Sequence, residues 1–343
     1  MTGPSARKCT VRSSCFWPAR SMAYAKPYLT IPQQLALIQS RGMHMTDIDK
    51  AAHALERIGY YRLSGFWHPF RLRTVAVTGT TKVVTVSDDF RPQSNFEAVV
   101  DLYVFDKKMR LHFMDVFERI EIALRVQISL LLGKVSPWAH RDPFALHGNF
   151  SKKRNPTSGK TKHEVWLERT DAAFNESRAE FADHFRKKYP GDYPPIWIAC
   201  EAWDFGAMST LFNGLAKADQ ETIAIQYGIT SFQIMESWLR CLNFARNCCA
   251  HHSRFWNRPL VIRPSWPSEI EAPKLFHIQS AGKALVRTYA VACLSKHMLD
   301  AINPTSSWGN RLKELCTAFP QNPAISLAAA GFPADWEKQP LWN

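Results

Sequence analysis

Residues 95–132 have the sequence NFEAVVDLYVFDKKMRLHFMDVFERIEIALRVQISLLL, and this stretch decides the fold class. Asn95 is a residue type that favours the N-cap of a helix. Beyond it, large apolar residues recur at steps of three and four, which is the period of one buried face of an α-helix. We therefore predict one long helix from Asn95 to Leu132, with Arg110, Arg119 and Arg125 off the apolar stripe. The stripe consists of Leu102, Phe105, Met109, Phe113, Val116, Ile120, Leu124, Ile128 and Leu131.

Helical signals continue on both sides of this segment. Thr30-Ile31-Pro32-Gln33 has the spacing of a capping box and opens a helix to about Gln39. A second helix is expected from Thr46 to Gly59, where glycine suits a left-handed C-cap, and residues 60–70 are expected to form an aromatic connector. Further helices are predicted at about 163–188, 196–203, 206–217, 219–227, 231–251, 281–300 and 307–318.

Residues 72–86 form the exception to the helical pattern. Val75 and Val77 precede Thr-Gly-Thr-Thr, and Val83, Val84 and Val86 follow it. Two runs of β-branched residues around a short turn sequence predict a β-hairpin. The predicted fold class is therefore all-α with a small β-hairpin insertion.

Composition limits the organisation and the partners of the chain. It has 343 residues and a net charge of +13, which favours a polyanionic partner, with nucleic acid ahead of a membrane, or simply a basic solvated surface. Residues 1–25 lack periodicity and are interpreted as a disordered extension, or as a mis-assigned start with translation beginning at Met22. Residues 26–343 are expected to form a single domain.

Apolar runs and cysteine spacing point to the cytoplasm. No apolar run approaches the length of a membrane span, and the basic N-terminus lacks the apolar segment of a secretory signal. The eight cysteines form no C-x-x-C pair. We therefore expect reduced thiols in a cytoplasmic protein without a membrane partner.

The candidate chemistry lies in residues 245–256, ARNCCAHHSRFW. Arginine supplies a planar cationic fork that fits a phosphate, and histidine transfers protons near neutral pH. Asn247 and His251 are four residues apart and point the same way on a helix. Arg246 and His251 are five apart, about 140° around an ideal helix. They converge on one phosphate only if the helix ends near Ala250 or if two copies of the segment meet.

Other interpretations of this segment stay open on spacing alone. A histidine pair at a helix end often serves as a hydrogen-bonding cap rather than as a catalyst. A zinc site built from Cys248, Cys249, His251 and His252 is disfavoured because adjacent residues do not converge as tetrahedral zinc requires. Cys248 as a nucleophile lacks an activating partner, and a buried helical cysteine usually serves packing. We expect no metal and no cofactor.

The segment Arg246-Asn247-x-x-Ala250-His251-His252, followed by Arg254-Phe255-Trp256-Asn257, resembles the signature of the abortive-infection (Abi) family, in particular the bacterial AbiD/AbiF-like proteins. The likeness covers about residues 26–342. It also includes residues 60–67 (YYRLSGFW), 101–106 (DLYVFD), 118–121 (ERIE), 195–197 (PIW) and 331–333 (GFP), and Trp336. Residues 1–25 have no counterpart, and the hairpin near 72–86 lies where such proteins vary.

The resemblance implies membership of the HEPN superfamily, whose ribonucleases carry an R-x4-6-H motif, with a HEPN-like helical bundle over about residues 95–301. It implies a homodimer in which two such motifs form one composite site. Catalysis would fall to Arg246, Asn247 and His251 in metal-independent cleavage of RNA. The alternatives are a non-catalytic RNA-binding module associated with a small non-coding RNA, and a protein-interaction subunit of a defence system.

Two further groups of residues are candidates for contact with RNA. His252, Arg254 and Asn257 are second choices, which either position RNA or brace the helix end, and Trp256 is interpreted as a packing residue ahead of a stacking one. The remaining candidates rest on charge alone. They are Arg110, Arg119, Arg125, Lys152, Lys153 and Arg154.

Overall fold

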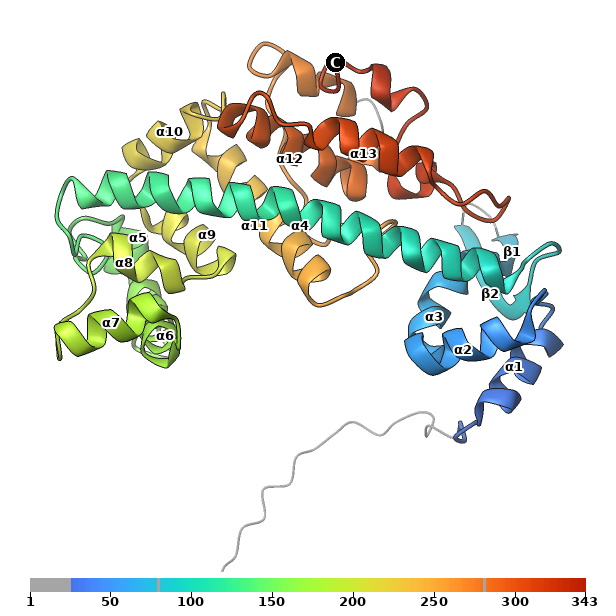
Figure 1. Cartoon of the computed structure of the whole chain (residues 1–343). Helices are drawn as coiled ribbons and strands as arrows, with labels where there is room; N and C mark the ends of the chain where they lie inside the picture. The colour runs from blue at the N-terminus through green and yellow to red at the C-terminus, as the bar shows by residue number, and fades with distance from the viewer. Residues whose placement is uncertain (1–25, 79–80, 280–281) are drawn as a thin grey trace, which may run out of the picture.

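The structure of the chain is a computed structural model that describes residues 26–78, 81–279 and 282–343. The expected extension over residues 1–25 lies outside the described residues. Helices dominate, and one antiparallel hairpin is present, which confirms the predicted fold class (Figure 1). Within the described part of the chain, no helix combines the length and apolar character needed to cross a membrane.

The elements follow one another in a simple order. The α-helices are α1 (Ile31–Ser40), α2 (Ile48–Ile58), α3 (Tyr60–Trp67), α4 (Phe96–Gly133), α5 (Gly148–Ser151), α6 (Lys162–Glu176), α7 (Glu180–Lys188), α8 (Ile196–Ala199), α9 (Phe205–Gly214), α10 (Lys217–Ile225), α11 (Phe232–Ala250), α12 (Thr288–Ile302) and α13 (Trp308–Thr317). The strands are β1 (Arg71–Thr78) and β2 (Thr81–Phe90). Short 3₁₀ turns are η1 (His68–Phe70), η2 (Cys200–Ala202), η3 (Pro273–Ile278), η4 (Gly282–Val286), η5 (Leu327–Ala330) and η6 (Trp336–Lys338).

Helix α4 is the central element around which the other helices pack. It spans 38 residues, and Asn95 caps it by accepting a hydrogen bond from the backbone N–H of Ala98. The long helix runs across the whole molecule, with α1–α3 and the hairpin at its N-terminal end and α5–α9 at its C-terminal end (Figure 1). Helices α11 and α12 both pack against it. The predicted stripe is buried, apart from the half-buried Leu131.

The predicted end of the second helix at Gly59 is confirmed, but three details around this helix are wrong. The cap of α2 is Asp47 rather than Thr46, because the Asp47 carboxylate accepts from the Lys50 N–H. Gly59 has a positive φ of 91°, but its ψ of 144° is not left-handed helical. The chain turns sharply there and restarts as α3. Residues 60–67 are thus helical and not a connector, because Leu63, Phe66 and Trp67 form one buried face.

The predicted helix over 163–188 is two helices. Helix α6 ends at Glu176, and α7 begins at Glu180. The guanidinium of Arg186 in α7 donates to the backbone oxygens of Phe174, at 2.7 Å, and Ser177, at 2.8 Å. These bonds satisfy carbonyl groups that the end of α6 leaves without helical partners. The end of α6 is therefore stabilised by a side chain of α7, and the periodicity of the sequence does not reveal this contact.

Candidate functional site

The site is organised around the C-terminal end of α11. The helix ends at Ala250, and His252 adopts a left-handed conformation with φ 56°. The N–H of His252 bonds to the oxygen of Cys249 at 3.1 Å, and that of Ser253 to the oxygen of Cys248 at 2.9 Å. This is the Schellman arrangement, here with histidine where glycine is usual. The predicted helix end near Ala250 is confirmed, and the side chains of His251 and His252 are exposed.

Long-range hydrogen bonds hold the segment that follows this helix end. A guanidinium nitrogen of Arg62 in α3 donates to the His252 oxygen at 2.7 Å, and Arg254 donates to the Gly65 oxygen. One carboxylate oxygen of Asp106 in α4 accepts the N–H groups of Phe255 at 2.8 Å and Trp256 at 2.7 Å. The histidines therefore sit on a backbone that is fixed by both α3 and α4.

Asp106 belongs to a buried ion pair. Its carboxylate lies 3.1 Å from Nε of Arg110, with exposed side-chain fractions of 0% and 6%. Burial raises the pKa of Asp106, whereas the two backbone N–H groups and the Arg110 charge favour its ionised form. Arg110 was expected off the apolar stripe as an RNA contact. It lies in the interior instead, because its charge compensates Asp106.

A second ion pair lies further along α4 and, unlike the first, joins this helix to α11. Nε of Arg246 is 3.9 Å from a carboxylate oxygen of Glu121, and the other oxygen of Glu121 is 3.1 Å from Arg125. Asn247 accepts a long hydrogen bond from Arg246 at 3.5 Å and donates one to Asn243 at 3.5 Å. Arg246 and Asn247 therefore lie together beside Glu121.

Glu121 is a site residue that sequence reasoning did not single out. It occurred within the ERIE segment of the family resemblance, and its spacing of four from Arg125 was the available signal. Burial raises the pKa of its carboxyl, while the charges of Arg246 and Arg125 lower it. The carboxylate lies beside one edge of the Arg246 guanidinium, at 3.9 Å, and leaves its other N–H groups for a ligand.

The residues just beyond the histidines mainly brace the helix end. Arg254 is committed to Gly65, and the backbone oxygen of Asn257 accepts a hydrogen bond from Arg287 at 2.6 Å. Trp256 has 0% exposure, so the packing interpretation holds and base stacking at this position is closed off. Among the second-choice residues, His252 alone is exposed, whereas Arg254 and Asn257 are half-buried.

Two of the basic candidates on α4 are already paired with carboxylates. Arg119 contacts Asp115 at 3.1 Å, and Arg125 contacts Glu121 at 3.1 Å and Glu201 at 3.2 Å. An arginine held by acidic partners gives a polyanion less to gain than a free one, since the ligand must displace or share those partners. Their role in RNA binding stays a prediction.

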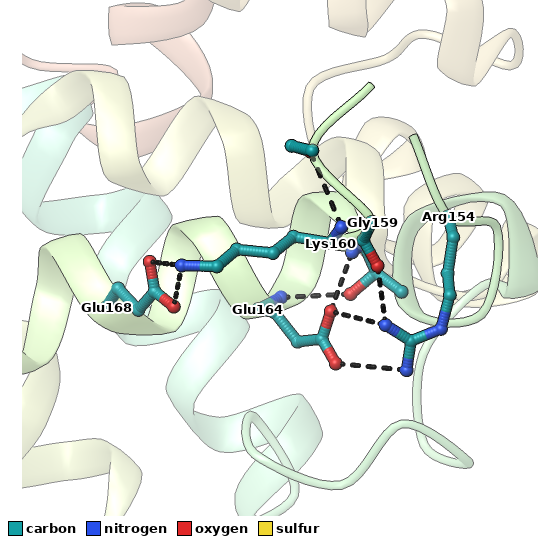
Figure 2. A network of polar contacts seen from close by, with 7 residues as sticks. Arg154, Gly159, Lys160, Glu164 and Glu168 are labelled. Atoms are coloured by element: carbon teal, nitrogen blue, oxygen red, sulfur yellow. Dashed lines mark hydrogen bonds and ion pairs between the residues drawn. The ribbon is translucent and has the colours of Figure 1, made fainter. Parts of the chain in front are cut away.

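The basic loop before α6 is also braced by ion pairs (Figure 2). Arg154 contacts Glu164 at 3.3 Å and donates to the Gly159 oxygen at 2.6 Å, while Lys160 contacts Glu168 at 2.6 Å. In the same loop, the Lys152 ammonium lies 4.5 Å from the Phe144 ring centroid. Lys153 is exposed and has no ion-pair partner among the described residues. Lys152 and Lys153 are thus the freer cations of this loop.

The two cysteines of residues 245–256 are unreactive because of where they lie. Cys248 and Cys249 are buried, and burial raises the pKa of both thiols, which disfavours a nucleophilic thiolate. The six cysteines within the described ranges are all free thiols. Across residues 26–78, 81–279 and 282–343, no group of three or more His, Cys, Asp or Glu side chains is arranged to hold a metal ion.

The fold and the site define a helical protein that presents an arginine, an amide and two histidines at one helix end. The family described as Abi-like protein matches residues 53–257, more than half of the chain, including all of α4 and α11. The chain therefore belongs to the Abi-like protein family, which places it among the abortive-infection proteins of phage defence. No curated protein and no solved structure matches the chain significantly.

Proposed function

We propose that this protein is an AbiD/AbiF-like member of the HEPN superfamily and a metal-independent endoribonuclease that acts in abortive infection. One observation carries the proposal. The end of α11 presents Arg246, Asn247 and two exposed histidines within seven consecutive residues, of which the first five are helical and the two histidines belong to the Schellman cap. A side chain that can bind a phosphate and side chains that can transfer protons therefore lie at the same helix end.

The proposed reaction is internal transesterification of RNA. One histidine takes the proton of a ribose 2′-hydroxyl, and the 2′-oxygen attacks the adjacent phosphorus. The bond from phosphorus to the 5′-oxygen breaks, and a second histidine donates a proton to that oxygen. The products are a 2′,3′-cyclic phosphate and a 5′-hydroxyl. Arg246 stabilises the negative charge that accumulates on the phosphoryl oxygens, and Asn247 orients the phosphate or His251.

A second copy of the chain completes this scheme. The reaction needs a base and an acid on opposite sides of the phosphate, whereas each chain carries one Arg–His motif. Arg246 is half-buried beside Glu121, while His251 points from the exposed end of the helix. In an isologous dimer, Arg246 of one protomer acts together with His251 of its partner.

The test is cleavage of RNA by purified protein with EDTA present, followed by mapping of the new ends. We expect cyclic phosphate and 5′-hydroxyl ends from the wild type, and a loss of at least about 100-fold in His251→Ala and Arg246→Ala. His53→Ala changes an exposed histidine on α2 and should leave cleavage unchanged. DNA should be inert because it lacks the 2′-hydroxyl. Equal cleavage by the wild type and His251→Ala, or none by either, would refute the nuclease.

A non-catalytic RNA-binding module is the second candidate. It is favoured by the net charge of +13 and by the Glu121 carboxylate beside Arg246, which offsets part of the positive charge that catalysis would use. This function predicts strongly salt-dependent RNA affinity without cleavage. If the protein is instead a protein-interaction subunit of a defence system, neither RNA cleavage nor salt-dependent RNA affinity is expected.

A further inference from the structure

A cavity opens beside the helix end that carries the histidines. It lies where α3, α4 and the end of α11 meet, and its volume of about 640 Å³ falls within the range of about 300–1,000 Å³ typical of ligand pockets. Its polar rim contains Arg62, Lys107 and His252, and its apolar wall contains Leu111 and Met114. The remaining lining residues are Tyr103, Arg110, Cys249 and Ala250.

The charges on the lining select an anion. None of the nine lining residues is acidic, and Arg110 is already neutralised by Asp106. Lys107 is exposed, and no described residue forms a hydrogen bond or ion pair with its ammonium group. Arg62 is exposed and donates to a backbone oxygen rather than to a carboxylate, so its positive charge is uncompensated. Two open cations therefore face one rim of the cavity.

The apolar part of the lining suits a flat apolar group. Leu111 is 62% exposed, although it sits on the helix that forms the core, and Met114 lies one turn further along. Tyr103 adds an aromatic ring at the edge of the same cavity. An apolar wall with adjacent cations matches the two parts of a nucleotide, which are a planar base and a phosphate.

The cavity is continuous with the candidate catalytic residues. Ala250 and His252 both line it, and His251 lies between them in the chain. On α4, Lys107, Leu111 and Met114 follow one another on one side of the helix, and Glu121 lies two turns beyond Met114 on that side, beside Arg246. A strand that follows the seam between α4 and α11 passes the cavity, His251 and Arg246 in turn.

We propose that this cavity binds one unpaired nucleotide of the RNA strand, adjacent to the phosphate held by Arg246 and His251. The assignment rests on the proposed ribonuclease function and gives it a substrate class, namely single-stranded RNA. Lys107 and Arg62 contact the phosphate of the bound nucleotide, and Leu111 and Met114 contact its base. A base within a duplex is stacked and paired, so it cannot enter without being extruded.

The charge contribution is tested with two neighbouring lysines. The measurement is anisotropy of a short, labelled single-stranded RNA with methylated 2′-hydroxyls, which the proposed reaction cannot cleave. Lys107→Glu should weaken binding about tenfold and lower the salt slope by about 1. Lys108→Glu makes the same charge change on the adjacent residue, which is exposed but does not line the cavity, and should stay within about twofold of the wild type. Equal losses in both variants would overturn the assignment.

The base contact is tested with a probe that lacks a base at one position. In the wild type, the best-placed abasic position should weaken binding about tenfold, whereas in Leu111→Ala the same change should cost little. Leu130→Ala removes a leucine of similar exposure on α4, 64% against 62%, outside the cavity and should behave as the wild type. An abasic penalty that is equal in Leu111→Ala and the wild type at every position would overturn the proposal, even with the lysine result as expected.

The outcomes separate this site from the nuclease function. If His251→Ala abolishes cleavage and the cavity variants bind the probe as the wild type does, the nuclease stands and the nucleotide site fails. If Lys107→Glu and Leu111→Ala lose binding while His251→Ala cleaves like the wild type, the nucleotide site stands and the proposed catalysis fails. A wild type that does not bind the probe refutes the nucleotide site.

Discussion

Two arginine–carboxylate pairs lie along α4, one within this helix and one between it and α11, and they differ in almost every physical respect. Asp106 and Arg110 are 3.1 Å apart and nearly fully buried, with exposed side-chain fractions of 0% and 6%. Glu121 and Arg246 are 3.9 Å apart, with exposed fractions of 14% and 29%. The first pair also receives two backbone N–H groups from Phe255 and Trp256, whereas the second is a loose contact beside exposed histidines.

The difference separates a pair that stabilises the structure from a pair that the proposed reaction would use. A buried charge is tolerated only when partners compensate it, and the charge of Asp106 is compensated by Arg110 and by two backbone N–H groups that bond to its Oδ1. Its role is to fix the backbone behind His252. The Glu121–Arg246 pair orients one edge of a guanidinium and leaves the rest available to a phosphate. The Asp106–Arg110 pair thus maintains the backbone conformation behind His252, and the proposed site beside Glu121 and Arg246 depends on that conformation.

The largest effect is expected at the buried pair. Asp106→Ala should lower the free energy of unfolding by about 3–5 kcal/mol, because it leaves Arg110 buried without its counter-charge and frees two backbone N–H groups. Urea denaturation measures the change. Glu121→Ala provides the comparison and should cost about 1 kcal/mol, since its site is partly solvated. Similar losses in both variants would contradict the distinction between the pairs.

The buried half of α4 should also be sensitive to acid. Burial lowers the pKa of His112, which stacks on Trp308 of α13 with ring centroids 4.7 Å apart, from 6.5 to about 4. Between these pH values the unfolded chain binds a proton that the folded chain does not, so stability falls as the pH decreases. His112→Gln should recover about 2 kcal/mol of the stability lost at pH 4. A pH dependence identical to that of the wild type would exclude His112 as a contributor.

At the open pair, the effect should appear in the kinetics. Glu121→Gln keeps the shape of the side chain but removes the charge that holds Arg246. We expect kcat for RNA cleavage to fall about tenfold because Arg246 loses its orientation. KM should fall as well, because a negative charge near the RNA path is removed. A rise in KM with unchanged kcat would show that Glu121 does not position Arg246.

The smallest effect is expected in the exposed network of the basic loop (Figure 2). The side chains of Arg154 and Glu164 are 64% and 42% exposed, so water and salt screen their attraction. Arg154→Ala should change the free energy of unfolding by less than about 1 kcal/mol. A thermal or urea transition resolves this difference. A loss comparable with that of Asp106→Ala would mean that exposure does not separate structural from dispensable pairs here.

Local sequence patterns predicted most of the secondary structure. The capping box at Thr30, the cap at Asn95, the long helix, the hairpin and the end of α11 near Ala250 are all present. The errors at Gly59 and between α6 and α7 lie where the chain restarts a helix after a short break. Such breaks depend on which side chains find partners after folding, as Arg186 does with the Phe174 oxygen.

The sequence by itself determined the helical class, the candidate motif and the point at which its helix ends, because periodicity, caps and turn residues act over a few positions. Tertiary structure alone decided that Asp106 holds the backbone at Trp256, 150 positions away, and that Glu121 holds Arg246. These outcomes require two helices to lie side by side, and the charge pattern of either helix alone does not specify its partner.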